Sequence, residues 1–247
     1  MSTHLDRVAV VTGAANGFGR AIAIEFARRG ADIIAVGLRP TQDVVSEIEA
    51  LGRKAIGLRA DVSDPDVATA LADDLMAFGG RVDILVNNAG VISSRDIFDL
   101  DFTEWKRLHQ VNSDSQFLMT KAVIGSMRAN GWGRIVNLAS NSLGLAVPGL
   151  VHYMASKGAV IGFTRALATD LAPFGITVNA VCPTASRTPG GERNIGQRKF
   201  DAISQMQAIK RVGLAEDIVG TVCFLSSDDC AFLTGQTLVA DGGLMRV

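Results

Sequence analysis

The sequence predicts an α/β fold: a doubly wound parallel sheet with helices on both faces. Three observations predict it. Short apolar runs rich in β-branched residues recur along the whole chain, segments with helical spacing lie between them, and the first run ends in a glycine-rich turn. Because parallel strands need crossover connections, this alternation is typical of right-handed βαβ units rather than of hairpins.

The predicted strands are apolar runs that we expect to be buried on both faces of the sheet. They are Arg7–Thr12, Asp32–Val36, Lys54–Ala60, Asp83–Asn87, Arg134–Leu138, Ile176–Val181 and Thr237–Ala240. No repeat, low-complexity tract or linker interrupts the series. Residues 1–247 are therefore predicted to form a single domain.

Capping residues mark the predicted helices between these strands. Asp64 followed by Pro65 is typical of a helix start, and the apolar residues beyond them recur at helical spacing. Asp101 and Glu104 have the spacing of a capping box, which predicts one long helix running to about Asn130. After the sixth strand, Pro183–Gly196 and the helix-like Gln197–Ile209 are expected to form an insertion over one sheet edge.

Composition excludes several function classes. The chain of 247 residues carries 24 Lys+Arg and 25 Asp+Glu with 48% hydrophobic residues, which argues against disorder and against nucleic-acid binding. Its three cysteines, Cys182, Cys223 and Cys230, lack metal-ligand spacing and are expected to be reduced. Neither a signal peptide nor a membrane span is visible, so we expect a cytoplasmic protein without a membrane partner.

A glycine-rich turn follows the first predicted strand. Gly13, Gly17 and Gly19 lie in TGAANGFG, directly before a helical pattern. Glycines at such a turn let backbone amides approach a pyrophosphate, and the following helix N-terminus attracts the anion. Strand, glycine turn and helix in this order predict a Rossmann-type dinucleotide-binding domain.

Two further motifs accompany this turn: Asn87-Asn88-Ala89-Gly90, and Tyr153 four residues before Lys157. With the spacing Gly-x-x-x-Gly-x-Gly and a length near 250, the chain resembles the classical short-chain dehydrogenase/reductase family over essentially all its residues. Segments such as NGWGRIVNLAS and TGQTLVADGG are most similar to members that reduce aryl ketones or oxidise 1-phenylethanol. ADIIAVGLRPTQDVVSEIEALGRKA shows a weaker likeness to sugar-acid dehydrogenases.

The resemblance implies four catalytic residues, Asn112, Ser140, Tyr153 and Lys157. Tyr153 and Lys157 are one helical turn apart, so a lysine ammonium can stabilise the phenolate that acid–base catalysis requires. Ser140 is implied to bind the substrate oxygen, whereas Ser142 is expected to have a turn-forming role. Asn112 is implied to hold a local helix distortion and a water that links Lys157 to solvent. On spacing alone, a surface pair on a helix would be the more common interpretation of Tyr153 and Lys157, and the resemblance reverses this.

A ketone and its secondary alcohol are the implied substrates, exchanging a hydride with a nicotinamide cofactor and a proton with Tyr153. The family uses no metal, and His152 is expected to be a pocket-wall or packing residue. The resemblance also implies a homotetramer, with Asp101–Asn130 and His152–Pro173 as its contact surfaces.

Cofactor choice depends on the end of the second strand. The acidic residue that holds the adenosine ribose of NAD is replaced by Gly37, and Leu38 and Arg39 follow. An arginine without a neighbouring carboxylate favours NADP(H), with NAD(H) as the alternative. Asn16, where many NADP-preferring relatives have a basic residue, argues for NAD, and Arg39 could also be a solvated loop residue. The residues expected at the cofactor are Gly13, Asn16, Gly17, Phe18, Gly19, Gly37, Leu38, Arg39, Asp61, Val62, Asn88, Ala89, Gly90, Tyr153, Lys157, Pro183, Ser186 and Thr188.

The expected substrate pocket has a mainly apolar wall. It comprises Asn141–Leu150, Ser93–Arg95, Thr184–Ala185 and a lid at about 184–212. Apolar walls favour an aryl or alkyl ketone. Three arginines in these segments keep a sugar acid as the alternative: Arg95, Arg187 and Arg193. A catalytically silent nucleotide sensor is the other alternative, although such proteins usually lose the catalytic residues that are present here.

Overall fold

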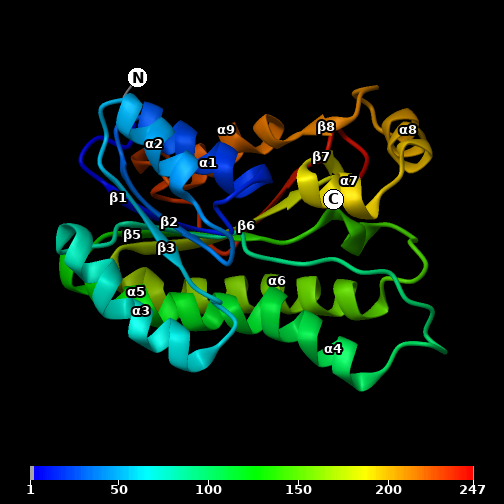
Figure 1. Cartoon of the computed structure of the whole chain (residues 1–247), viewed down its shortest axis with the longest axis horizontal. Coiled ribbons are helices and arrows are strands. Elements are labelled where there is room, and N and C mark those ends of the chain that lie inside the picture. The colour runs from blue at the N-terminus through cyan, green and yellow to red at the C-terminus, as the bar shows by residue number, and fades with distance from the viewer. Residues whose placement is uncertain (1–2, 247) are drawn as a thin grey trace.

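A computed structural model describes residues 3–246, and a seven-stranded parallel sheet lies at its centre (Figure 1). The strand order is β3-β2-β1-β4-β5-β6-β9, so the order reverses between β1 and β4. Ligands of such sheets bind beyond the carboxyl ends of the strands at this reversal. The strands are β1 (Val8–Thr12), β2 (Asp32–Gly37), β3 (Ala55–Arg59), β4 (Ile84–Asn87), β5 (Gly133–Leu138), β6 (Ile176–Pro183) and β9 (Thr237–Ala240).

Helices cover both faces of the sheet, which confirms the predicted doubly wound α/β fold. Figure 1 shows α1 (Gly17–Arg28), α2 (Gln42–Ala50) and α9 (Val219–Leu225) on one face. The other face carries α3 (Pro65–Gly79), α5 (Ser115–Asn130) and α6 (Val151–Leu171). Because alternate strand residues point to opposite faces, the core divides into two clusters. In β1, Ala9 and Val11 join the α1 cluster, while Val8 and Val10 join the α3–α5 cluster.

The expected burial of every strand on both faces was wrong at the two edge strands, β3 and β9, whose residues are half-buried or exposed. The residues of β1, β4 and β5 are all buried, as predicted for the middle of the sheet. By contrast, Gly57 and Arg59 of β3 are exposed and the rest of that strand is half-buried. The reason is its place at the sheet edge, where it has one neighbouring strand and less cover.

The single long helix expected from residue 101 to about 130 is interrupted. It consists of α4 (Phe102–His109), a five-residue π-helix η1 (Gln110–Asp114) and α5. The Asp101 carboxylate caps α4 by accepting the Glu104 N–H at 2.8 Å. The predicted capping box is only half formed, because the Glu104 side chain turns to other partners. Asp64, by comparison, caps α3 as predicted.

A small second sheet lies above the carboxyl edge of the main one, at the right of Figure 1. After β6 the chain forms β7 (Ser186–Arg187), α7 (Pro189–Asn194) and α8 (Gln197–Met206), and β7 pairs with β8 (Gly213–Leu214). The predicted helix 197–209 ends three residues early, where Ile209 N–H bonds Gly242 O at 2.9 Å instead. Short 3₁₀ turns complete the chain: η2 (Asn141–Gly144), η3 (Ala172–Phe174), η4 (Ala215–Ile218) and η5 (Asp228–Cys230).

Membrane insertion has no support among the helices. Within residues 3–246, none combines the length and the apolar character that crossing a bilayer requires.

Candidate active site

The turn between β1 and α1 has the geometry that the glycine spacing predicts. Gly13 and Gly17 have φ of +65° and +57°, a region that side chains disfavour. At Gly19 a Cβ atom would lie 2.4 Å from Gly13 O, so only glycine lets α1 start this close to β1. Within residues 3–246, the N-cap residue Asn16 caps none of the α1 N–H groups with its side chain. The start of α1 is therefore a suitable anion site.

Asn88 joins this turn to the end of β4. Its Nδ2 donates to Thr12 O at 2.8 Å, and its backbone N–H donates to Thr12 Oγ1 at 3.0 Å. Ala89 N–H donates to the same hydroxyl at 3.0 Å. Thr12 thus holds the two strands together where the strand order reverses, a role that the sequence analysis missed. A hydroxyl residue as the last strand position before the glycine turn was the available signal.

Tyr153 and Lys157 come from the first two turns of α6. The buried Lys157 Nζ donates to Leu138 O, at the end of β5, over 2.7 Å. A Cβ on Gly90 would lie 3.5 Å from Nζ, so the loop after β4 passes directly beside the ammonium group. Burial in this setting lowers the pKa of Lys157 to about 8.

The Tyr153 phenol lies with Ser140 at the carboxyl edge of the sheet. Burial raises the pKa of Tyr153, and a side-chain hydrogen bond with Ser140 opposes that rise. Ser140 follows β5 and is buried; its hydroxyl donates to Ser142 Oγ at 2.9 Å and accepts the Ser142 N–H at 3.2 Å. Tyr153 and Ser140 therefore meet just beyond β5, and Lys157 binds the end of the same strand two residues before Ser140.

Asn112, the fourth, is buried inside the π-helix η1. Its Oδ1 accepts the Val91 N–H at 2.8 Å, and its Nδ2 donates to Val91 O at 2.9 Å and to Ser156 Oγ at 3.0 Å. Ser156 in turn donates to Tyr153 O at 2.7 Å. The helix distortion implied at Asn112 is present, and it lets one amide join the loop after β4 to α6. Ser156 was not identified from the sequence.

At the other end of the predicted cofactor site, the chain is open to solvent. A Cβ on Gly37 would lie 3.1 Å from Arg39 O and 3.2 Å from the Thr41 methyl group, so a larger residue would crowd this turn. Leu38 and Arg39 are exposed. Across the sheet edge, Asp61 is exposed and accepts hydrogen bonds from both the N–H and the hydroxyl of Ser63, while Val62 is buried.

The segment after β6 lies against the glycine turn. Thr188 caps α7 by accepting the Gly191 N–H at 3.0 Å, and a Cβ on Gly17 would lie 3.3 Å from Thr188 Cβ. Pro183 ends β6, and the buried Ser186 hydroxyl donates to Thr184 O. Phe18 is half-buried at the start of α1. These predicted cofactor residues thus surround the turn from two sides.

The arginines of the predicted pocket do not form an anion site together. Arg187 donates to Gln197 Oε1 at 2.8 Å and lies 3.8 Å from Glu192. Arg95 and Arg193 are exposed, and the Arg95 backbone N–H bonds Gly149 O.

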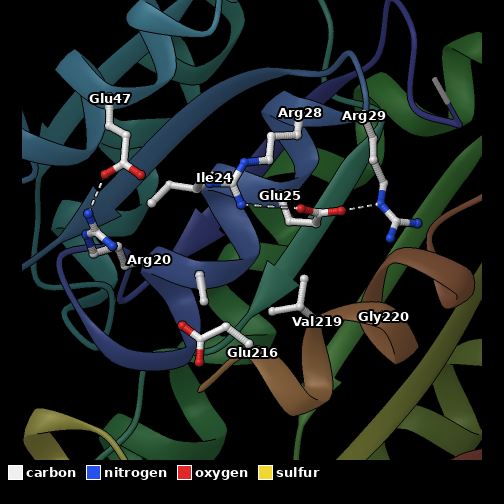
Figure 2. Close-up of a pocket in the computed structure, with 10 residues that line it drawn as sticks. Arg20, Ile24, Glu25, Arg28, Arg29, Glu47, Glu216, Val219 and Gly220 are labelled. Carbon is white, nitrogen blue, oxygen red and sulfur yellow. Dashed lines mark hydrogen bonds and ion pairs between the residues drawn. The ribbon is translucent and has the colours of Figure 1, made fainter. Parts of the chain in front are cut away.

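A cavity of about 330 Å³ on the α1–α9 face lies elsewhere and contains none of the predicted site residues. Figure 2 shows most of its charged side chains in ion pairs, Arg20 with Glu47 and Glu25 with both Arg28 and Arg29, while Glu216 is drawn without one. Since the paired charges neutralise each other, we do not assign the reaction to this cavity. Its lining residues are Arg20, Ala21, Ile24, Glu25, Arg28, Arg29, Glu47, Glu216, Val219 and Gly220.

Comparison with known proteins agrees with this geometry. Residues 13–245 match the family model described as enoyl-(acyl carrier protein) reductase. The 3-oxoacyl-[acyl-carrier-protein] reductase FabG of Haemophilus influenzae is 37% identical over 239 residues, which cover 96% of this chain and 98% of the relative. Fold and matches together define an NAD(P)-dependent oxidoreductase that acts on CH–OH groups.

Two solved structures extend the comparison. A Beutenbergia cavernae protein described as an NAD(P)-dependent gluconate 5-dehydrogenase, with NADP bound at low occupancy, is 36% identical over 98% of each chain, with a TM-score of 0.93. Carveol dehydrogenase of Mycobacterium avium, in complex with NAD, is 30% identical over 99% of each chain, with a TM-score of 0.92. The chain belongs to the classical short-chain dehydrogenase/reductase family.

Proposed function

We propose that this protein interconverts an apolar ketone, aryl or alkyl, and its secondary alcohol, with Tyr153 as the acid–base residue. The observation that carries the proposal is that the Tyr153 phenol bonds Ser140 just beyond β5, while the Lys157 ammonium, one helical turn along α6, binds Leu138 O at the end of that strand. An ammonium group near a phenol favours the phenolate, and that effect makes a tyrosine useful near neutral pH.

The residues present fit a nicotinamide dinucleotide. Glycine at position 19 leaves the space that a Cβ would fill, and the uncapped start of α1 offers N–H groups to a pyrophosphate. When bound there, the cofactor supplies the hydride in ketone reduction and accepts it in alcohol oxidation. Lys157 and Asn88–Gly90 are proposed to hold its nicotinamide and ribose end.

In reduction, Tyr153 Oη gives its proton to the carbonyl oxygen as that oxygen gains negative charge. The Ser140 hydroxyl, now bonded to Ser142, would turn to donate to the same oxygen and orient the carbonyl. Lys157 stabilises the tyrosinate that remains. Oxidation follows the reverse path, with tyrosinate as the base that takes the hydroxyl proton. Asn112 acts through Val91 and Ser156, which it bonds, by positioning the loop and helix around the phenol.

An apolar substrate is supported by the segment that follows Ser140 in the sequence. Leu143, Leu145 and Val147 are partly or fully exposed beside it, and they offer hydrophobic surface rather than charge. Such walls bind apolar groups and leave orientation to a few polar atoms. Similarity to carveol dehydrogenase, an enzyme named for an apolar cyclic alcohol, points the same way.

A sugar acid is the second candidate, favoured by the similarity to the gluconate 5-dehydrogenase structure. The exposed Arg95 and Arg193 are the residues that could bind its carboxylate. We place it second because Arg187 already has partners in Gln197 and Glu192. A silent nucleotide sensor is disfavoured by the presence of Ser140, Tyr153 and Lys157 together.

NADP(H) is the proposed cofactor, with NAD(H) as the alternative. Gly37 leaves no carboxylate to repel a 2′-phosphate, and the exposed Arg39 follows it by two residues. The crowding around Gly37 supports the view that an acidic residue is not readily accommodated there.

For the rest of the molecule, we propose one catalytic domain over residues 1–247 with a substrate lid at about 184–212, located in the cytoplasm. We further propose a homotetramer that uses α4, α5 and α6 as contact surfaces. Sedimentation at several protein concentrations tests the assembly, and a stable monomer would contradict it.

The function is tested by following the near-ultraviolet absorbance of NADPH and NADH with a panel of carbonyl compounds. Acetophenone, 5-ketogluconate and a 3-oxoacyl thioester represent the three chemistries. We expect acetophenone to have a kcat/KM at least roughly tenfold above that of the ketogluconate, since an apolar wall does not pair a carboxylate. Faster reduction of the ketogluconate would favour the sugar-acid function. Cofactor binding without consumption across the panel would favour the sensor.

A further inference from the structure

Three side chains from three segments form a hydrogen-bonded chain beside Tyr153. Ser93, in the loop after β4, donates to Glu104 Oε1 on α4 at 2.5 Å. The same Ser93 Oγ lies 2.9 Å from Nε2 of His152, the residue before Tyr153 on α6. Arg107 binds Glu104 with two N–H groups at 2.7 and 2.8 Å. His152 is fully buried, while Ser93 and Glu104 are half-buried, so this chain runs from the interior toward the surface.

The chemistry of the three groups fixes the direction of every hydrogen bond. The paired Arg107 and the Ser93 hydroxyl lower the pKa of Glu104 to about 2, so the carboxylate only accepts. The single Ser93 proton is therefore used toward Glu104, and Ser93 Oγ must accept from His152. Burial lowers the pKa of His152, which keeps the imidazole neutral. It follows that Nε2 carries the proton and Nδ1 does not.

The chain lies where the predicted substrate wall meets the helix that carries the proposed acid. The loop after β4 contains Ser93–Arg95 and is also tied to the start of α6 by Arg95 N–H to Gly149 O at 2.9 Å. On α6 itself, the Ser93–His152 hydrogen bond reaches the residue that directly precedes Tyr153. Among the described residues, His152 Nδ1 has no hydrogen-bond partner, so Nε2 alone anchors the ring.

We propose that Ser93, His152 and Glu104 act as a positioning relay that sets the distance between the substrate wall and Tyr153. These are positioning residues, because none of them exchanges a proton or hydride with the substrate. The proposal rests on the proposed ketone reductase function only where its test is kinetic. A separate spectroscopic test requires no enzyme activity.

The kinetic test compares Ser93→Ala with Ser93→Thr, which retains the hydroxyl. We expect Ser93→Ala to raise the KM for acetophenone roughly five- to tenfold and to leave the KM for the nicotinamide cofactor within about twofold, with Ser93→Thr restoring most of the loss. Ser226→Ala is the matched control, because Ser226 Oγ makes the same 2.9 Å bond to a buried histidine, His4, far from this site. If Ser93 has a purely structural role, both alanine variants should lose the same melting temperature, and Ser93→Ala should change the KM for acetophenone and the KM for the cofactor by the same factor. That result would overturn the proposal.

The spectroscopic test uses ¹⁵N-labelled histidine in the full-length protein, which has only three histidines. We expect the His152 signal, assigned with His152→Gln, to show the Nε2–H tautomer at neutral pH and to change in Ser93→Ala but not in Ser226→Ala. An Nδ1–H tautomer, or a signal that Ser93→Ala leaves unchanged, would overturn the relay even if the enzyme reduces ketones. If the tautomer is as expected and no ketone is reduced, the relay stands and the proposed function fails.

Discussion

The two ends of the proposed cofactor site are built in different ways. Around Tyr153, buried side chains hold one another: Asn112 alone makes three hydrogen bonds, and Lys157 Nζ is bound at 2.7 Å. Around Gly37, the exposed Leu38 and Arg39 lie in a turn that faces solvent. We therefore expect substitutions around Tyr153 to lower turnover or stability, whereas substitutions around Gly37 should alter only which cofactor binds.

The strongest test of this comparison is Tyr153→Phe. Removing the hydroxyl deletes the proton donor without changing the ring, so we expect turnover to fall at least ~10³-fold, within the range for loss of a general acid. The dissociation constant of the cofactor, measured by fluorescence titration, should change less than about threefold. Residual turnover within tenfold of the wild type would remove Tyr153 from the mechanism.

The Lys157→Met variant tests separately how Lys157 contributes to activity and to the free energy of unfolding. Because burial lowers the pKa of Lys157 from 10.5 to about 8, the unfolded chain binds more protons than the folded chain between these values. The free energy of unfolding contributed by this group therefore rises with pH, by about 2 kcal/mol between pH 8 and 10.

The variant should lack this rise and should lose activity without losing stability at neutral pH. Urea unfolding at several pH values provides the measurement. Identical pH slopes in the two proteins would show that the lysine is not held in a desolvated position.

Asn112→Ala should disrupt the buried hydrogen bonds beside Tyr153. The change leaves the Val91 N–H and carbonyl without their partner, which costs about 2 kcal/mol of unfolding free energy. We expect kcat to fall along with stability, since Ser156 and Tyr153 are reached through the same amide. The exposed Asn130→Ala serves as the control and should change stability by less than about 0.5 kcal/mol. Equal effects of the two variants in chemical denaturation would contradict the account of η1.

The sequence predicted local features better than contacts between distant segments. The strands, the glycine turn and the one-turn spacing of Tyr153 and Lys157 are all set by near neighbours, and the observed elements match them closely. The residues of the π-helix at 110–114 continue a helical pattern, so the distortion was implied by the family resemblance and not by the local pattern; Asn112 there bonds a loop 21 positions away.

Tertiary pairing also explains which contacts the sequence did not predict. Ser93 and His152 are 59 positions apart, and Thr12 bonds residues 76 and 77 positions further along. No periodicity carries such information. Likewise, the exposure of β3 depends on its place at the sheet edge, which is a property of strand order rather than of the Ala55–Arg59 run.

Arg39→Ala should have the smallest effect and sharpens the comparison at the exposed end. If the guanidinium binds a 2′-phosphate, its removal should raise the KM for NADPH about tenfold, equivalent to about 1.4 kcal/mol, and leave the KM for NADH unchanged. Lys54→Ala, at an exposed lysine just before β3, controls for the loss of one positive charge. Stability and kcat should not change in either variant, because Arg39 makes no buried contact. A wild-type enzyme that already prefers NADH would overturn the NADP(H) proposal, yet it would leave the contrast between the buried and the exposed end intact.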